Sequence, residues 1–251
     1  MITTILATLL SAYAQVCSCP CKGEINYTCD FKTSWQACGF SEQAKALPRA
    51  SIVNIDTKTA ARLLTKPGDN NVAGSGTAER DDLTMNQAST GASEGKEQWW
   101  SHQVYFPVDY IAPPVSTTWH WGVVMNFHNT NPGAGQANVQ LVVLPGGVLS
   151  FWIMGGTLPQ AKKDFATIVK NKWYNFTYQI KWSSNTDGYF KAWVDGKMVW
   201  EYKGPNMYPN QGVYLKLANY HTAIGKNVAL VHTNIKRGTG PIVSPIALEG
   251  M

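Results

Sequence analysis

The clearest pattern in the chain is the alternation of side chains in VYLKLANYH, residues 213–221. Successive side chains of a β-strand point to opposite faces of its sheet, so every second residue shares a face. One face of this segment is apolar and suits a core: Val213, Leu215 and Leu217. The other face carries Tyr214, Lys216, Ala218 and Tyr220. The segment therefore predicts a half-buried strand whose open face, with a lysine and a small residue between two tyrosines, suits ligand binding.

The same period of two recurs through most of the chain. Segment 118–128, TWHWGVVMNFH, alternates strictly. One of its faces holds Trp119, Trp121, Val123, Met125 and Phe127, and the other holds His120, Gly122, Val124, Asn126 and His128. Further strand candidates are 52–55, 61–64, 99–107, 137–144, 147–154, 173–182, 188–194 and 197–202. Turn residues separate these segments, as at Pro145-Gly146-Gly147 and Asp195-Gly196.

Helical periodicity is hard to find in this chain. Segment 160–169 is the best candidate, and we expect a short helix or a loop there. Many short strands with frequent turn signals predict an all-β fold, a concanavalin A-like two-sheet sandwich of the jelly-roll type. Sheets of this size curve, and a concave open face is a natural platform for a long ligand.

Composition supports this fold class and narrows the partners. The 251 residues are 12% aromatic and only 15% charged, with a formal net charge of +5. A modest positive charge favours anionic partners. Because the chain has only four arginines and no basic run, nucleic-acid binding is disfavoured. No apolar run reaches the roughly 18 residues that span a membrane.

The N-terminal part suggests export. Residues 1–14 resemble a signal peptide that ends at Ala12-Tyr13-Ala14, so we expect a secreted protein. Residues 15–40 form a Cys-rich lead-in, and residues 41–251 are expected to form a single domain that acts as a monomer. Among the five cysteines, Cys29 and Cys38 are the best candidates for a disulfide. No histidine or further cysteine follows the CSCPC motif at zinc-ligand spacing, so we expect no such metal site.

Two strands offer chemistry on their open faces. One presents His120, Asn126 and His128, and the other presents Tyr214, Lys216 and Tyr220. Residues four apart on a strand are separated by roughly 13 Å. Lys216 is therefore expected to meet an anionic group at an outer subsite rather than to tune Tyr220 directly.

These residues resemble a known family. YLKLANYH is similar to the K-x-G-x-Y strand of the jelly-roll polysaccharide lyases of the heparin lyase I-like and glucuronan lyase-like group, with Ala218 in place of the glycine. VVMNFHNT resembles that group's histidine-bearing strand, with Asn126 where many members carry glutamine. The hairpin from Trp173 to Lys197 and the segment AERDDL around Arg80 are also similar.

The resemblance implies β-elimination in a uronic-acid-containing polysaccharide. A base removes the C5 proton of the uronate, and an acid protonates the leaving oxygen O4. It assigns Tyr220 as acid/base and His128 as a partner base or a neutraliser of the carboxylate. Asn126 and Arg80 are candidates for holding the carboxylate, and Tyr214 and His120 for further substrate contacts. Which of Tyr220 and His128 takes the proton stays open.

Other interpretations remain open at this point. Tyr220, Tyr214, Lys216 and His128 are also compatible with ordinary strand-surface roles, and Arg80 with an ion pair to a neighbouring acid. His120 fits a structural role better than a catalytic one. The main alternative function is a non-catalytic carbohydrate-binding or lectin-like sandwich. A glycoside hydrolase is disfavoured because no strand carries the paired carboxylates that such enzymes use. The sequence requires no cofactor; a structural Ca²⁺ near Asp69 and Asn70 is conceivable but has no motif behind it.

Overall fold

The computed structural model describes residues 23–131, 136–154 and 159–242. The expected signal peptide at 1–14 and three of the five cysteines lie outside this part of the chain. In the described part, no helix is long and apolar enough to cross a membrane.

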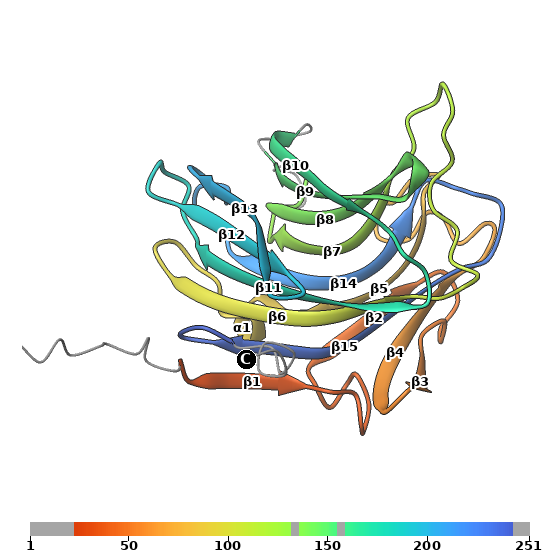
Figure 1. Cartoon of the computed structure of the whole chain (residues 1–251), viewed down its shortest axis with the longest axis horizontal. Helices are drawn as coiled ribbons and strands as arrows, with labels where there is room; N and C mark the ends of the chain where they lie inside the picture. The colour runs from red at the N-terminus through yellow and green to blue at the C-terminus, as the bar shows by residue number, and fades with distance from the viewer. Residues whose placement is uncertain (1–22, 132–135, 155–158, 243–251) are drawn as a thin grey trace, which may run out of the picture.

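Two antiparallel sheets face each other, as the sequence predicted (Figure 1). The eight-stranded sheet has the order β13-β12-β11-β6-β15-β4-β3, with β1 paired to β15. Its strands are β1 (Ile25–Cys29), β3 (Ser51–Ile55), β4 (Lys58–Thr65), β6 (Glu97–Phe106), β11 (Lys172–Lys181), β12 (Tyr189–Val194), β13 (Lys197–Lys203) and β15 (Val228–Gly238).

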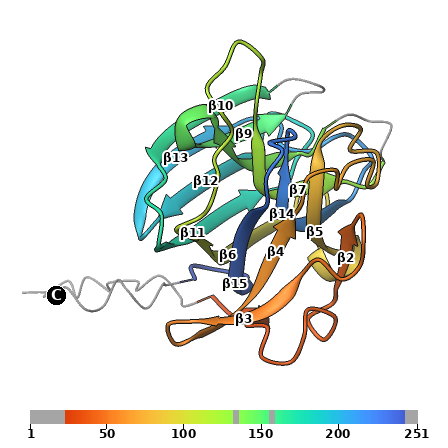
Figure 2. The same cartoon turned by 90° about the vertical axis from the view of Figure 1, so that its right-hand side faces the viewer.

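The seven-stranded sheet carries the candidate site and has the order β10-β9-β8-β7-β14-β5-β2. Its strands are β2 (Phe40–Ala44), β5 (Glu79–Met85), β7 (Gly122–Asn129), β8 (Val139–Leu144), β9 (Val148–Met154), β10 (Pro159–Thr167) and β14 (Val213–His221). Both sheets are strongly curved in the same sense (Figure 1), and Figure 2 shows β14 and β5 close to β15 and β4. Short helical segments are α1 (Gln87–Thr90) and the 3-10 turn Pro145–Gly147, which joins β8 to β9.

The core lies between the sheets and is rich in aromatic rings. Its largest fully buried side chains include Trp100, Trp182, Tyr178, Phe127 and Phe151. Phe127 meets Trp100, Trp182 and Tyr178 edge-on, a favoured arrangement of aromatic pairs. The high aromatic content of the sequence is therefore used largely to fill the space between two curved sheets.

The first strands extend the sandwich toward the N-terminus. β1 adds to β15 and β2 adds to β5, so residues before 41 already belong to the sheets. The Cys29–Cys38 disulfide joins the end of β1 to the loop before β2, which confirms the predicted pair. The lead-in thereby links the two sheets covalently at this edge.

The expectation of a helix or loop at 160–169 is wrong. Most of this segment is strand β10, which pairs with β9 at the edge of the seven-stranded sheet. Phe165 stacks on the buried Phe151 at 4.7 Å between ring centroids, which fixes the strand on the core. Lys162 and Lys163 suit an edge strand because lysines there discourage pairing with other chains.

Candidate active site

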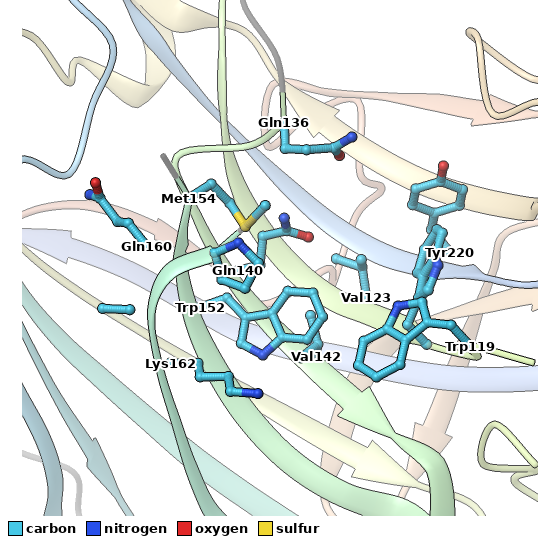
Figure 3. Close-up of a pocket in the computed structure, with 13 residues that line it drawn as sticks. Trp119, Val123, Gln136, Gln140, Val142, Trp152, Met154, Gln160, Lys162 and Tyr220 are labelled. Atoms are coloured by element: carbon cyan, nitrogen blue, oxygen red, sulfur yellow. The ribbon is translucent and has the colours of Figure 1, made fainter. Parts of the chain in front are cut away.

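A cavity of about 740 Å³ lies on the concave face of the seven-stranded sheet (Figure 3). Its lining comes from β7, β8, β9, β10 and β14 and from the segments that adjoin them. The lining residues are Trp119, Trp121, Val123, Gln136, Gln140, Val142, Trp152, Met154, Pro159, Gln160, Ala161, Lys162 and Tyr220. Tyr220 is the one residue in this described lining that the sequence analysis predicted to act on a substrate.

Tyr220 reaches the cavity because β14 keeps a regular alternation. It lies opposite Arg80 on β5 and opposite Val123 on β7. The ring of Trp121 meets it edge-on at 4.8 Å, and the guanidinium carbon of Arg80 lies 3.8 Å from its ring centroid. A cation at this distance over an aromatic face is attracted by the ring. Tyr220 is thus held between an indole and a cation.

Beneath this side of the groove lies a buried network of three charged side chains. Asp82 Oδ2 is 3.1 Å from Arg80 Nε and 3.5 Å from Lys216 Nζ. Lys216 also donates a hydrogen bond of 2.7 Å to Gln43 Oε1, and Arg80 donates to the carbonyl oxygens of Val72 and Ala73. We call Arg80, Asp82 and Lys216 the charged network.

The network corrects the expectation for Lys216. Its side chain is only 4% exposed and is paired with Asp82, so it does not present a free ammonium group at an outer subsite. Burial lowers the pKa of Lys216, and Asp82 opposes that shift. Burial raises the pKa of Asp82, and Lys216 and Arg80 oppose it. Lys216 therefore acts as a partner of Asp82 beneath the groove.

The same surroundings set the acidity of Tyr220. Burial raises the pKa of its phenol, and the nearby Arg80 cation works in the opposite direction. A free phenol titrates at about 10, so Tyr220 carries its proton at neutral pH. Arg80 is placed to stabilise the phenolate whenever that proton leaves.

The structure does not bring His128 to Tyr220. His128 lies opposite Tyr214, and their rings stack at 5.2 Å. Tyr220 lies opposite Val123, five residues away from His128 on β7, which is roughly 17 Å of strand. Burial lowers the pKa of His128 to about 4, so its imidazole is neutral at physiological pH. His128 is therefore separated from the phenol by more than one sugar unit.

A β-bulge explains why the strict alternation expected for 118–128 is wrong. The pairing of β7 with β8 shifts between Val123 and Met125. Val124 and Met125 are consecutive, yet both are buried in the core between the sheets. The extra residue of a bulge shifts the faces of all residues beyond it. Trp121 and Val123 consequently share the concave face with Asn126 and His128 instead of opposing them.

His120 and Asn126 occupy different parts of this face. The Nδ1 atom of His120 is 3.1 Å from Thr222 Oγ1, two residues beyond Tyr220, so His120 lies nearer to Tyr220 along the sheet than His128 does. Asn126 lies opposite Lys216 and opposite Gln140 and is buried, and its Oδ1 atom has no hydrogen-bond partner among the described residues. Asn126 is thus a polar group with unused hydrogen-bonding capacity beside the groove.

The other half of the groove was not predicted. The exposed Trp119 stacks on Trp152 at 6.2 Å, and Lys162 lies opposite Trp152 on the edge strand (Figure 3). Trp152 and Lys162 come from segments that the sequence marked only as a strand and as a helix or loop. The abundance of tryptophan was the one signal for Trp152, and it does not say which indoles line a groove; Lys162 had no such signal.

Both carboxylate oxygens of Asp69, which the sequence analysis named as a conceivable Ca²⁺ ligand, have hydrogen-bond partners in the structure. Asp69 Oδ1 and Oδ2 both accept hydrogen bonds from Arg49 at 2.8 Å, and Oδ2 also accepts from the backbone N–H of Lys66. In the described residues, no group of three or more His, Cys, Asp or Glu side chains is arranged to hold a metal. Asp69 serves to anchor Arg49.

Comparison with known proteins identifies the family of this chain. The family model described as polysaccharide lyase matches residues 28–236. The chain belongs to the polysaccharide lyase family. No curated protein sequence matches it significantly.

Solved structures share the fold of this polysaccharide lyase at low sequence identity. An endo-β-1,4-glucuronan lyase from the fungus Trichoderma reesei is similar with a TM-score of 0.64 and 15% identity, covering 86% of this chain and 96% of its own. Alginate lyase vAL-1 from Chlorella virus has a TM-score of 0.58 and 12% identity, covering 86% and 100%. A double mutant of alginate lyase Aly36B, in complex with an alginate tetrasaccharide, has a TM-score of 0.55 and 14% identity, covering 87% and 98%.

Proposed function

We propose that this polysaccharide lyase cleaves a uronic-acid-containing polysaccharide by β-elimination, with Tyr220 as its acid/base. The observation that carries the proposal is the phenol of Tyr220 in the cavity with the Arg80 cation against its ring. Glucuronan and alginate, named for the structural neighbours, are both polymers of uronic acids, which supports this substrate class.

The reaction follows from the acidity of the uronate C5 proton. The phenolate oxygen of Tyr220 takes that proton, the C5–H electron pair forms a C4=C5 double bond, and the bond from C4 to O4 breaks. The same phenol then gives its proton to O4. The charge that develops on the sugar carboxylate during this step needs neutralisation by a cation or hydrogen-bond donor. Arg80 supports the phenolate, and the Nδ2 amide of Asn126 is the candidate hydrogen-bond donor to the carboxylate.

The geometry favours Tyr220 over His128 for both proton transfers. Within the described lining of the cavity, Tyr220 and Lys162 are the titratable side chains. His128 pairs with Tyr214 instead and donates its Nδ1–H to the carbonyl of Asn129. We also propose that the protein acts outside the cell, because the Cys29–Cys38 disulfide is a bond that persists in oxidising compartments.

Tyr220→Phe tests the proposal most directly. The variant keeps the ring beside Arg80 and Trp121 but loses the hydroxyl, so we expect kcat to fall by about 10²–10⁴-fold while polymer binding is retained. The measurement is the ultraviolet absorbance of the unsaturated product on a panel of uronate polymers, together with calorimetric binding.

Tyr189→Phe is the matched control. Tyr189 is a half-buried tyrosine on β12 in the other sheet, and this variant is expected to keep wild-type turnover. The profile of kcat/KM should rise with pH in the neutral range, because burial raises the pKa of the phenol and more base forms at higher pH. Near-normal turnover by Tyr220→Phe would remove Tyr220 from the mechanism. Binding of uronates without any unsaturated product would favour a carbohydrate-binding protein.

A further inference from the structure

The groove between Tyr220 and Lys162 contains almost no charge. Among the described residues that line the cavity, Lys162 is the only one with a charged side chain. Its floor is an apolar cluster of five buried residues, against which Trp121, Leu144 and Tyr220 pack. These five are Val123, Val142, Trp152, Met154 and Ala218. Counting strands from β10, which carries Lys162, to β14, which carries Tyr220, the two ends of the groove are four strand spacings apart, or roughly 19 Å.

The indole of Trp119 stacks on Trp152, one of the five floor residues. Trp119 is 59% exposed and lies nearly parallel to Trp152, with 18° between the ring planes. A large exposed indole is costly to leave in water and is a frequent feature of binding sites. Figure 3 shows Trp152 between Lys162 and Trp119, and the amide of Gln140 nearby. Flat apolar rings beside amide groups match a sugar unit, which has apolar C–H faces and hydroxyl groups at its rim.

A chain made only of uronates does not match this surface. A sugar over Val123, Val142 or Met154 would bring its carboxylate against apolar side chains. Among the described lining residues the cation is Lys162, which lies on the edge strand opposite Trp152. Removing an ion from water without a partner is strongly unfavourable. The cations of the charged network lie at the Tyr220 end, and Lys162 lies at the other end.

We propose that this stretch of the groove binds uncharged sugar units, so that the substrate is a heteropolysaccharide in which neutral sugars separate the uronates. The inference rests on the proposed function and adds the class of substrate to it. The uronate that is cleaved lies at Tyr220, the neutral units lie on Trp119 and Trp152, and the next carboxylate along the chain reaches Lys162.

A panel of polymers tests the proposal with the full protein. The panel contains polyglucuronate, polymannuronate and polyguluronate as homopolymers, and polymers whose backbones combine 1,4-linked glucuronate with neutral hexoses. We expect kcat/KM for at least one heteropolymer to exceed that for every homopolymer by about tenfold or more. A homopolymer cleaved as well as or better than every heteropolymer overturns the inference and leaves the lyase function intact.

Trp119→Ala and Trp193→Ala form a matched pair of variants. Trp193 is a half-buried tryptophan that stacks on Trp99 at 5.4 Å in the eight-stranded sheet, outside the cavity. Trp119→Ala should raise KM for the heteropolymer about tenfold with little change in kcat, and Trp119→Phe should restore part of it. Trp193→Ala should leave both constants unchanged. An unchanged KM in Trp119→Ala overturns the inference.

Binding separates the two proposals if no polymer yields product. Calorimetric titration with the same panel is then the readout. Tighter binding of a heteropolymer than of any homopolymer, weakened in Trp119→Ala, supports the neutral-sugar groove while β-elimination fails. Equal or tighter binding of the homopolymers, or no binding of any polymer, overturns it.

Discussion

Two buried polar clusters of this protein respond to burial in opposite ways. The charged network of Arg80, Asp82 and Lys216 lies beneath the groove, where each ion has a partner within 3.5 Å. His102 and His232 lie between the sheets with their ring centroids 6.2 Å apart. Within the described part of the chain, the Nε2 atom of His102 and the Nδ1 atom of His232 have no hydrogen-bond partner.

The difference between them shows how charge is kept near the groove. Burial lowers the pKa of His232 to about 3 and that of His102 well below its usual range, so both rings stay neutral. Beneath the groove, the one anion of Asp82 pairs with both cations, and the cation of Arg80 also contacts the ring of Tyr220. Buried ions persist when they are paired, whereas unpaired titratable groups lose their charge.

The largest expected effect comes from breaking the charged network. Asp82→Asn keeps the shape of the side chain but leaves Arg80 and Lys216 buried without their anion, which should reduce the free energy of unfolding by about 3–5 kcal/mol. Urea denaturation at neutral pH measures it. Glu201→Gln, which breaks the half-exposed pair with Lys191, is the control and should change stability far less. A stability loss no larger than that of the control would show that Asp82 is already neutral in the native state.

The neutral histidines His102 and His232 should make the free energy of unfolding depend on pH. Their native pKa values lie below the unfolded value of about 6.5, so the unfolded chain binds protons first as the pH falls. Each buried histidine then costs up to about 1.4 kcal/mol of stability per pH unit below 6.5. His102→Phe keeps an aromatic ring against Phe176 and removes one of these groups. Its stability relative to wild type should therefore rise as the pH falls from 6.5 toward 4, as measured by urea denaturation; a constant difference would contradict this assignment.

The smallest effect, a modest loss of kcat, is expected for a substitution of His128. His128 is half-buried at the groove and neutral above about pH 4, but it lies beside Tyr214. His128→Asn should lower kcat less than tenfold, far less than Tyr220→Phe, because it removes no proton transfer. The same assay of unsaturated product measures both variants. An equal loss of kcat in His128→Asn and Tyr220→Phe would indicate that the imidazole takes part in proton transfer.

Much of the fold was predictable because it depends on local patterns. The alternation in β14 correctly assigned Leu215 and Leu217 to the core and Tyr220 to the open face. The proline-glycine turn correctly joined β8 to β9. The prediction for segment 160–169 was wrong because its lysines and scattered apolar residues are equally compatible with a helix, and only pairing with β9 makes it a strand.

The site was less predictable because it depends on register. The sequence named Tyr220 and Arg80, which lie next to each other in the structure, but it also paired Tyr220 with His128, which strand pairing places opposite Tyr214. Trp152 and Lys162 gave no signal of their own, since their importance comes from lying across the groove from Tyr220.

By itself the sequence determined the two-layer β architecture, the Cys29–Cys38 pair and the open face of β14, since side-chain parity and turn residues act over a few positions. Only the tertiary structure decided which strands became neighbours, where the bulge in β7 exchanged its faces, and which ions were buried together. Those outcomes depend on contacts between segments far apart in the chain, and a shift of one residue in pairing changes every one of them.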